Sequence, residues 1–241
     1  MDPVTNAEAA SLVITWSRLG ESRYVCIANV HMLMEAWDSV DFQKIVTASD
    51  LVTSDGMPLV WMVRAKGYPD HERVYGPALM LHILEAAERE AVPVGFYGSS
   101  PEVLERLIKR MQARYEGLNV VYSFSPPYNA PSQAEDEAIV ERINSSGVRI
   151  LFVSLGCPKQ EIWMAEHRGR VKAVMLGVGA AFDFHAGVKP QAPAWLQKVG
   201  LEWLVRLLSE PRRLWRRYLY HNPRFILLAL LDLLGFMKPK R

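Results

Sequence analysis

Cysteine is scarce in this chain of 241 residues, which contains only Cys26 and Cys157. Neither belongs to a C-x-x-C pair that could bind a metal ion or exchange electrons, and two cysteines do not make a disulfide framework. The N-terminal segment lacks the basic start and apolar core of a signal peptide. These absences predict a protein of a reducing compartment, the cytoplasm.

Long hydrophobic runs are also missing. The longest uninterrupted apolar run near the C-terminus covers residues 225–231. Extended past Asp232 to Met237, it would form a helix only about 20 Å long, whereas the hydrocarbon core of a bilayer is about 30 Å thick. We therefore predict that this segment does not cross a membrane alone.

The common metal and cofactor motifs do not occur either. The six histidines are scattered, and neither D-x-D nor H-E-x-x-H is present, so we predict no metal site and metal-independent chemistry. The G-x-G-x-x-G of dinucleotide-binding folds and the G-x-x-x-x-G-K-[ST] of phosphate loops are missing as well. We therefore predict no organic cofactor.

Charge divides the chain at residue 198. Residues 1–197 contain 18 Lys and Arg against 23 Asp and Glu, a net charge of −5, whereas residues 198–241 contain 10 against 3, a net charge of +7. We predict a domain at 1–197 that would carry the catalytic residues and a basic helical appendage at 198–241. The arginines of the appendage alternate with Trp and Tyr, a composition that suits anionic lipid headgroups.

Two other interpretations of the appendage remain. Its helix could pack on the domain as an ordinary amphipathic element, or its arginines could bind nucleic acid. The acidic domain and the apolar C-terminal stretch argue against nucleic acid. An appendage that alternates between packing and membrane contact could also self-associate, so a homo-oligomer is possible.

Short apolar runs alternate with segments of helical period between residues 24 and 178. Residues 25–28, 51–53, 94–97, 120–124, 150–155 and 173–178 are predicted strands. Pro77 and Pro101 mark helix starts, and Ser132 with Glu135 forms a capping box. The proline-rich segment 125–131 is a predicted loop. Together these signals predict an α/β, Rossmann-like, mostly parallel sheet with helices on both faces and ligands at the carboxyl ends of the strands.

Polar residues follow the first two strands. Asp55 comes directly after a strand and before Gly56, where a general base would lie, although Asp-Gly also favours a turn and Asp can cap a helix. Asn29 and His31 follow the first strand and could contact a ligand, or serve as a turn or cap. Gly98 begins a strand-to-helix turn whose backbone N–H groups could face an anion, although a plain turn is an equal alternative.

Two later strand ends are denser in polar groups. Lys159, Gln160 and Glu161 place a cation, an amide and a carboxylate at a helix start, which favours a ligand site over a solvated first turn. The small residues at 177–181 would let a flat ligand approach the backbone, and Asp183 could then hold a ribose hydroxyl. Tight chain packing would require the same small residues.

Seven ordered segments carry a resemblance to a known family. They are Asn-Val-His at 29–31, Ser-Asp-Gly-Met at 54–57, Arg-Val-Tyr-Gly at 73–76, Phe-Tyr-Gly at 96–98, Gly-Cys-Pro-Lys-Gln-Glu at 156–161, Gly-Ala-Ala-Phe-Asp at 179–183 and Gly-Leu-Glu-Trp-Leu at 200–204. In this order they resemble the WecG/TagA/CpsF glycosyltransferases, glycosyltransferase family 26. The resemblance runs from about residue 24 to about residue 225.

The resemblance implies an inverting, metal-independent transfer of a sugar, such as N-acetylmannosamine or a related hexose, from a UDP-sugar to a polyprenyl-diphosphate-linked saccharide. The enzyme would act peripherally on the inner membrane face in cell-surface polysaccharide biosynthesis. Asp55 would deprotonate the acceptor hydroxyl. The residues implied to line the donor pocket or meet the diphosphate are Asn29, Arg73, Gln160, Asp183, Arg206, Arg213 and Arg216. Ile27 stands where the family usually has Thr.

Two other functions remain as alternatives. Alternating strands and helices also occur in nicotinamide-dependent oxidoreductases, which the missing glycine motif disfavours. A non-catalytic membrane adaptor would explain the basic appendage but not the polar strand ends.

Overall fold

A single sheet of six parallel strands forms the centre of the molecule. The computed structural model describes residues 1–127, 129 and 131–236. The strands are β1 (Arg23–Ala28), β2 (Leu51–Ser54), β3 (Val94–Gly98), β4 (Val120–Phe124), β5 (Ile150–Ser154) and β6 (Val174–Gly177), in the order β2-β1-β6-β5-β3-β4. All six lie where the apolar runs predict them, and the Rossmann-like α/β fold is confirmed.

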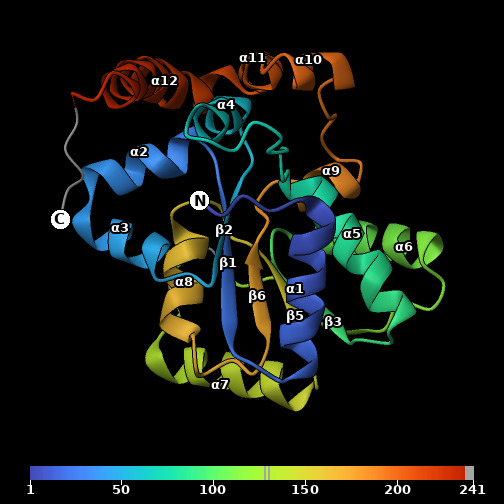
Figure 1. Cartoon of the computed structure of the whole chain (residues 1–241). Helices are drawn as coiled ribbons and strands as arrows, with labels where there is room; N and C mark the ends of the chain where they lie inside the picture. Colours follow the sequence, from blue (N-terminus) through green and yellow to red (C-terminus); the bar gives the residue numbers. More distant parts are fainter. Residues whose placement is uncertain (128, 130, 237–241) are drawn as a thin grey trace.

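Helices cover both faces of this sheet (Figure 1). One face packs against α1 (Asn6–Arg18), α5 (Gly76–Arg89), α6 (Pro101–Arg114) and α9 (Ala181–His185). The other face packs against α2 (Val30–Asp38), α3 (Val40–Thr47), α4 (Met57–Ala65), α7 (Gln133–Ser145) and α8 (Lys159–His167). Successive residues of a strand point to opposite faces, so Val25 and Ile27 enter the first core while Tyr24 and Cys26 enter the second.

The local start signals of the helices act as predicted. Pro77 and Pro101 stand in the first turns of α5 and α6, where a missing N–H costs nothing. Ser132 and Glu135 form the capping box that begins α7. The predicted loop 125–131 includes residues 128 and 130, which lie outside the described residues; its described residues form no helix or strand.

The carboxyl ends of the strands lie at one edge of the sheet, because parallel register pairs Ala28 with Ser54 and Cys26 with Gly177. The helices α2, α4 and α9 begin at this edge. Across it lie α10 (Ala194–Lys198), α11 (Glu202–Ser209) and α12 (Pro211–Leu233) (Figure 1). Asn29 and Asp55, two of the polar residues predicted at the strand ends, therefore lie beside the basic C-terminal helices.

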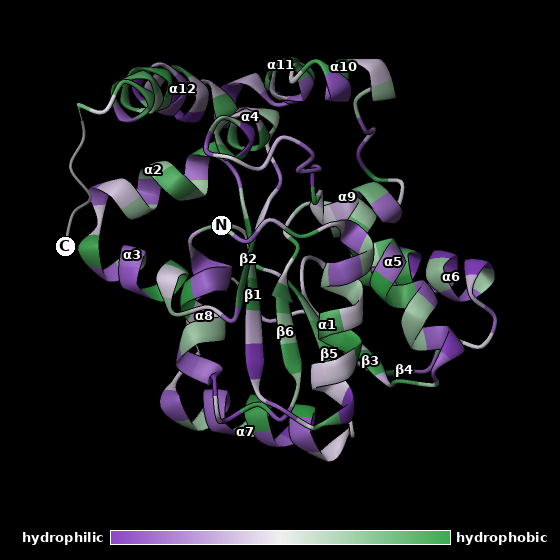
Figure 2. Ribbon diagram, viewed as in Figure 1, coloured by the Kyte–Doolittle hydropathy of each residue, from purple (hydrophilic) through white to green (hydrophobic). Residues whose placement is uncertain are grey.

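The helix α12 packs on the body through one stripe of side chains. Leu214, Tyr218, His221 and Phe225 are buried, and α12 contacts α2. Hydrophobic and hydrophilic residues alternate along α12, in contrast to the mostly hydrophobic β6 (Figure 2). Within the described residues, no helix is long and apolar enough to span a membrane. The described part of segment 225–237 belongs mainly to α12, and residue 237 lies outside the described residues.

Candidate active site

Asp55 lies at the end of β2 and is held by one arginine. Its backbone N–H donates to the Ala28 carbonyl at 2.7 Å, which fixes the start of the loop. Arg73 donates from Nη2 to Asp55 Oδ1 at 2.8 Å and from Nε to the Asp55 carbonyl at 2.6 Å. Gly56 is the N-cap residue of α4 and has no side-chain cap bond. The Asp55 carboxylate therefore pairs with Arg73 and leaves the helix uncapped.

Burial raises the pKa of Asp55 above its ordinary value, the Arg73 guanidinium opposes this rise, and the neighbouring Glu202 carboxylate adds to it. A carboxylate with a raised pKa is a stronger base than one in water. This environment suits a group that accepts a proton.

Glu202 connects the C-terminal helices to this site. Its Oε2 accepts from Arg73 Nη2 at 2.7 Å, and its Oε1 lies 3.4 Å from the Tyr75 hydroxyl. Arg73 also lies over the Tyr75 ring at 4.1 Å from the centroid. Sequence reasoning did not assign Glu202 a role, although the Gly-Leu-Glu-Trp segment at 200–203 contains it.

A polar cavity of about 390 Å³ opens between the strand ends and the C-terminal helices. Gly177 and Gly179 form part of its wall, and a Cβ at Gly177 would meet Gln160 Nε2 at 2.9 Å. The cavity is also lined by Ile27, Asn29, Asp55, Gln160, Lys189, Arg206, Arg213 and Arg217. Small residues from the strand ends and cations that come mostly from the C-terminal helices thus surround one space.

The amide of Gln160 is fixed at this cavity from two sides. Its Oε1 accepts from the Gly156 N–H at 3.2 Å, and its Nε2 donates to Glu161 Oε1 at 2.7 Å. Glu161 is fully buried, and burial raises its pKa. Glu161 therefore contributes by orienting Gln160.

A second cavity, of about 670 Å³, adjoins the first and is mainly apolar. Its wall comes from α4 and from the C-terminal helices, and includes Met57, Pro58, Trp61, Met62, Leu201, Trp203, Leu219, Ile226, Ala229, Leu230 and Leu233. The two cavities share Asn29, Asp55, Arg206, Arg217 and Tyr218. Asp55 thus borders a polar and an apolar space at once.

Asn29 and Arg217 lie together where the cavities meet. Asn29 Oδ1 caps α2 by accepting from the Met32 N–H at 3.2 Å, so the capping interpretation of Asn29 is correct while the residue also lines both cavities. Arg217 Nη2 lies 3.5 Å from the same oxygen, and Arg217 Nε is buried without a hydrogen-bond partner. Arg217 is absent from the predicted binding residues, yet it contacts Asn29 at the end of β1 and lines both cavities.

His31 borders the apolar cavity together with Arg73. Burial lowers the pKa of His31 to about 3, assisted by the nearby positive charge of Arg217 and by His221. The imidazole is therefore neutral near pH 7. The histidines are scattered in the sequence, but His31 and His221 meet in the structure with ring centroids 5.0 Å apart.

Other predicted site residues lie outside both cavities within the described structure. Gly98 has φ +110°, and a Cβ there would lie 2.4 Å from the Ser154 carbonyl, so chain packing requires this glycine. Lys159 and Arg216 are exposed. Asp183 pairs with Lys189 at 2.8 Å, and that lysine does line the polar cavity. Of the predicted appendage arginines, Arg206 and Arg213 line the polar cavity and Arg216 does not.

Fold and site together define a class of protein: a Rossmann-like α/β protein with two cavities at the carboxyl edge of a parallel sheet, beneath basic helices, where such folds bind their ligands. The family model described as "Glycosyl transferase WecG/TagA/CpsF family" matches residues 1–239. The chain belongs to this family. It is therefore a glycosyltransferase of cell-surface polysaccharide biosynthesis, and the resemblance found in the seven sequence segments is confirmed.

Proposed function

We propose that this protein is an inverting, metal-independent glycosyltransferase that moves a hexose, such as N-acetylmannosamine or a relative, from a UDP-sugar to a polyprenyl-diphosphate-linked saccharide. The observation that carries this proposal is the position of Asp55 on the common border of a polar and an apolar cavity. A polar donor and a lipid-linked acceptor need two such spaces, and the reacting groups must meet where the spaces join.

The polar cavity suits the donor. A diphosphate is best met by guanidinium groups, which bind its oxygens through paired, charge-assisted hydrogen bonds. Arg206, Arg213 and Arg217 line this cavity. Gly177 and Gly179 let a flat base or a sugar approach the backbone. Ile27, at the wall, places an apolar group where the family usually has a hydroxyl, so it would influence which sugar is accepted.

The apolar cavity suits the acceptor lipid. Its aliphatic and aromatic wall can cover several isoprene units, which gain free energy in proportion to the apolar area they remove from water. The wall continues into exposed apolar side chains of α12, among them Ile226, Leu230 and Leu233. A lipid could therefore reach Asp55 from a membrane that contacts α12.

In the proposed reaction, Asp55 takes the proton of the acceptor hydroxyl while the oxygen of that hydroxyl attacks the anomeric carbon of the donor. The bond between that carbon and the UDP oxygen breaks on the opposite face, which inverts the configuration. The negative charge that develops on UDP is stabilised by Arg206 and Arg217. A base in this role contributes about 10² to 10⁴ in rate.

The C-terminal helices would form the membrane-associating appendage of 198–241. Exposed Trp215 and Tyr220 accompany arginines there, and exposed Trp195 lies just before this segment. Aromatic rings and guanidinium groups are typical of proteins that lie at the headgroup level of an anionic membrane. This favours a peripheral position at the inner face of the cell membrane.

Thermal unfolding of the full chain in detergent tests the donor assignment. Any ligand specific to the folded state stabilises it, and at 100 times its Kd the gain is about 2.7 kcal/mol, or a rise in Tm of about 5 to 10 °C. The proposal predicts a rise with UDP and none with NAD. A rise with NAD alone would instead support the nicotinamide-dependent alternative. Vesicle binding without transfer to any lipid-linked acceptor would support the adaptor.

A further inference from the structure

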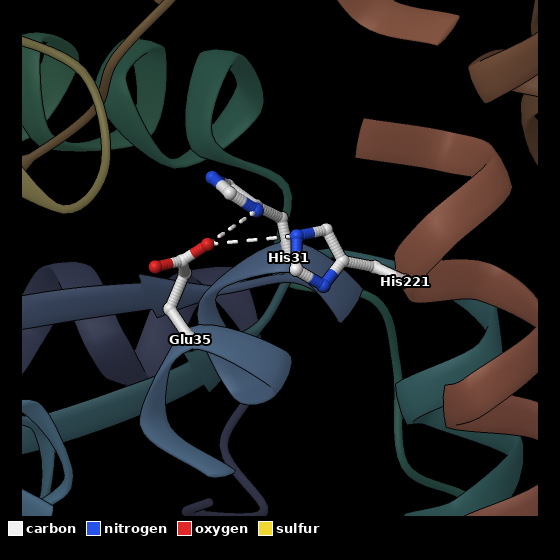
Figure 3. Close-up of side chains that lie close together, drawn as sticks. All are labelled: His31, Glu35 and His221. Carbon is white, nitrogen blue, oxygen red and sulfur yellow. Dashed lines mark ion pairs between the residues drawn. The ribbon is translucent and has the colours of Figure 1, made fainter. Parts of the chain in front are cut away.

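Three potential metal ligands converge where the C-terminal helix α12 packs on α2 (Figure 3). His31 and Glu35 are four residues apart on α2, so they lie on one face of that helix. His221 reaches them from α12. Glu35 Oε1 lies 3.6 Å from His31 Nδ1 and 3.5 Å from His221 Nε2. The three ligand atoms all lie within 4.8 Å of one another.

The two separations measured from Glu35 match a small tetrahedral ion. Zinc–nitrogen and zinc–oxygen bonds are about 2.0 to 2.2 Å long, which places neighbouring ligand atoms roughly 3.4 Å apart. The separations of 3.5 and 3.6 Å are close to that value but too long for hydrogen bonds. Two imidazoles and one carboxylate are also a ligand set used by zinc enzymes.

Two buried imidazole nitrogens of the cluster lack hydrogen-bond partners, which favours a bound ion. Nδ1 of His31 and Nδ1 of His221 are buried and have no hydrogen-bond partner. Buried polar atoms without partners are rare and costly. An ion bound to Nδ1 of His31 would remove one of the two unpartnered atoms.

The charges around the cluster leave its carboxylate available. Within the described residues, the ion pairs of Glu35 are those with His31 and His221, and no lysine or arginine joins them. The positive charge of Arg224 acts on His221, and Asp38 neutralises Arg224 through contacts of 2.6 and 2.8 Å. Arg217 faces His31 and opposes a cation. Glu35 is 34% exposed, so an ion could enter from its side.

We propose that His31, Glu35 and His221 bind one divalent transition-metal ion of the zinc class, with water completing a tetrahedral shell. Because the ligands come from α2 and α12, the ion would fasten the C-terminal helix to the body and hold the two cavities closed on that side. This role is separate from the chemistry at Asp55 and does not depend on the proposed sugar transfer.

Cobalt substitution of the untagged, full-length chain tests this site. After removal of metals with a chelator, one equivalent of Co²⁺ should produce the visible absorption bands of a tetrahedral complex, and one equivalent of Zn²⁺ should abolish them. Excess Zn²⁺ should raise Tm by about 5 to 10 °C at 100 times its Kd. Glu35→Gln and His221→Gln should each weaken binding at least tenfold.

His82→Gln is the matched control, since His82 is an exposed histidine on α5. It should bind Co²⁺ as the wild type does. The far-ultraviolet circular dichroism and the Tm of the chelated variants establish that each is folded. Absence of a tetrahedral spectrum in the wild type would overturn the proposal, as would a spectrum that survives unchanged in folded Glu35→Gln and His221→Gln.

Discussion

Glu202 of α11 accepts a hydrogen bond from Arg73 of the body at 2.7 Å, and the same Arg73 nitrogen lies 2.8 Å from Asp55. One guanidinium group therefore joins two carboxylates that come from the sheet edge and from the C-terminal helices. Because the two carboxylates share one nitrogen, each weakens the ion pair that Arg73 forms with the other. The proton affinity of Asp55 thus depends on whether the C-terminal helices are in place.

The substitution Glu202→Gln should move the pH profile of activity. The negative charge of Glu202 raises the pKa of Asp55, so its removal lowers that pKa. A base acts only when deprotonated, and the acidic limb of the kcat profile should therefore shift to lower pH. The measurement is kcat against pH for the variant, the wild type and Glu166→Gln, an exposed control on α8. An unmoved acidic limb would disprove this coupling.

Substitution of Arg217 should lower kcat/KM for the sugar nucleotide more than substitution of a neighbouring exposed arginine. A charge-assisted hydrogen bond contributes about 1.5 to 3 kcal/mol, so Arg217→Gln should lower kcat/KM for the sugar nucleotide about 10- to 150-fold. Arg212 is exposed on the same helix and borders neither cavity. With a short, detergent-soluble acceptor, Arg212→Gln should stay within twofold of the wild type. Equal losses in the two variants would remove Arg217 from the site.

The opposite ranking is expected for membrane binding. Each Lys or Arg near an anionic surface contributes about 1 kcal/mol, so Arg212→Gln should weaken binding to vesicles that contain phosphatidylglycerol about fivefold. Arg217→Gln should change vesicle binding little, since this side chain faces the cavities. Cosedimentation over a range of salt concentrations measures both. Vesicle binding that does not respond to salt would contradict an electrostatic attachment.

Glu161 should make the stability of the protein depend on pH. Burial raises its folded-state pKa above the ordinary 4.5, so the folded state binds more protons than the unfolded state in the window above pH 4.5. The contribution of Glu161 to stability is therefore most favourable below that window and becomes less favourable as pH rises through it to the folded-state pKa. Glu161→Gln removes this dependence and should gain stability relative to the wild type as pH increases. Urea unfolding from pH 4.5 to 8 tests this, with Glu166→Gln as the exposed control.

Much of this architecture follows from local sequence signals. Six apolar runs gave six strands, and the prolines at 77 and 101 gave the starts of α5 and α6, since these signals act within a few residues. Asp55 and Asn29 were found because the carboxyl ends of parallel strands gather at one edge. The family segments added Arg73, which no strand pattern indicates.

The remaining site depends on how distant elements pack. Arg216 and Arg217 differ by about 100° around α12, and the packing of the helix decides which of them faces the strand ends. The buried stripe of Leu214, Tyr218 and Phe225 was the available signal. Arg217 lies three residues after Leu214, close to one helical turn, and therefore lies on nearly the same side of α12 as this stripe. The approach of His31 to His221 joins residues far apart in the sequence and has no local signature.

The most direct test of the account is transfer of labelled sugar from a UDP-sugar to a polyprenyl-diphosphate-linked acceptor by Asp55→Asn. Asp70→Asn, which changes an exposed aspartate, is the matched control. We predict that Asp55→Asn lowers kcat by about 10² to 10⁴ while still gaining thermal stability from UDP, and that Asp70→Asn behaves as the wild type. Turnover by Asp55→Asn at the wild-type rate would contradict the assignment of Asp55 as the base.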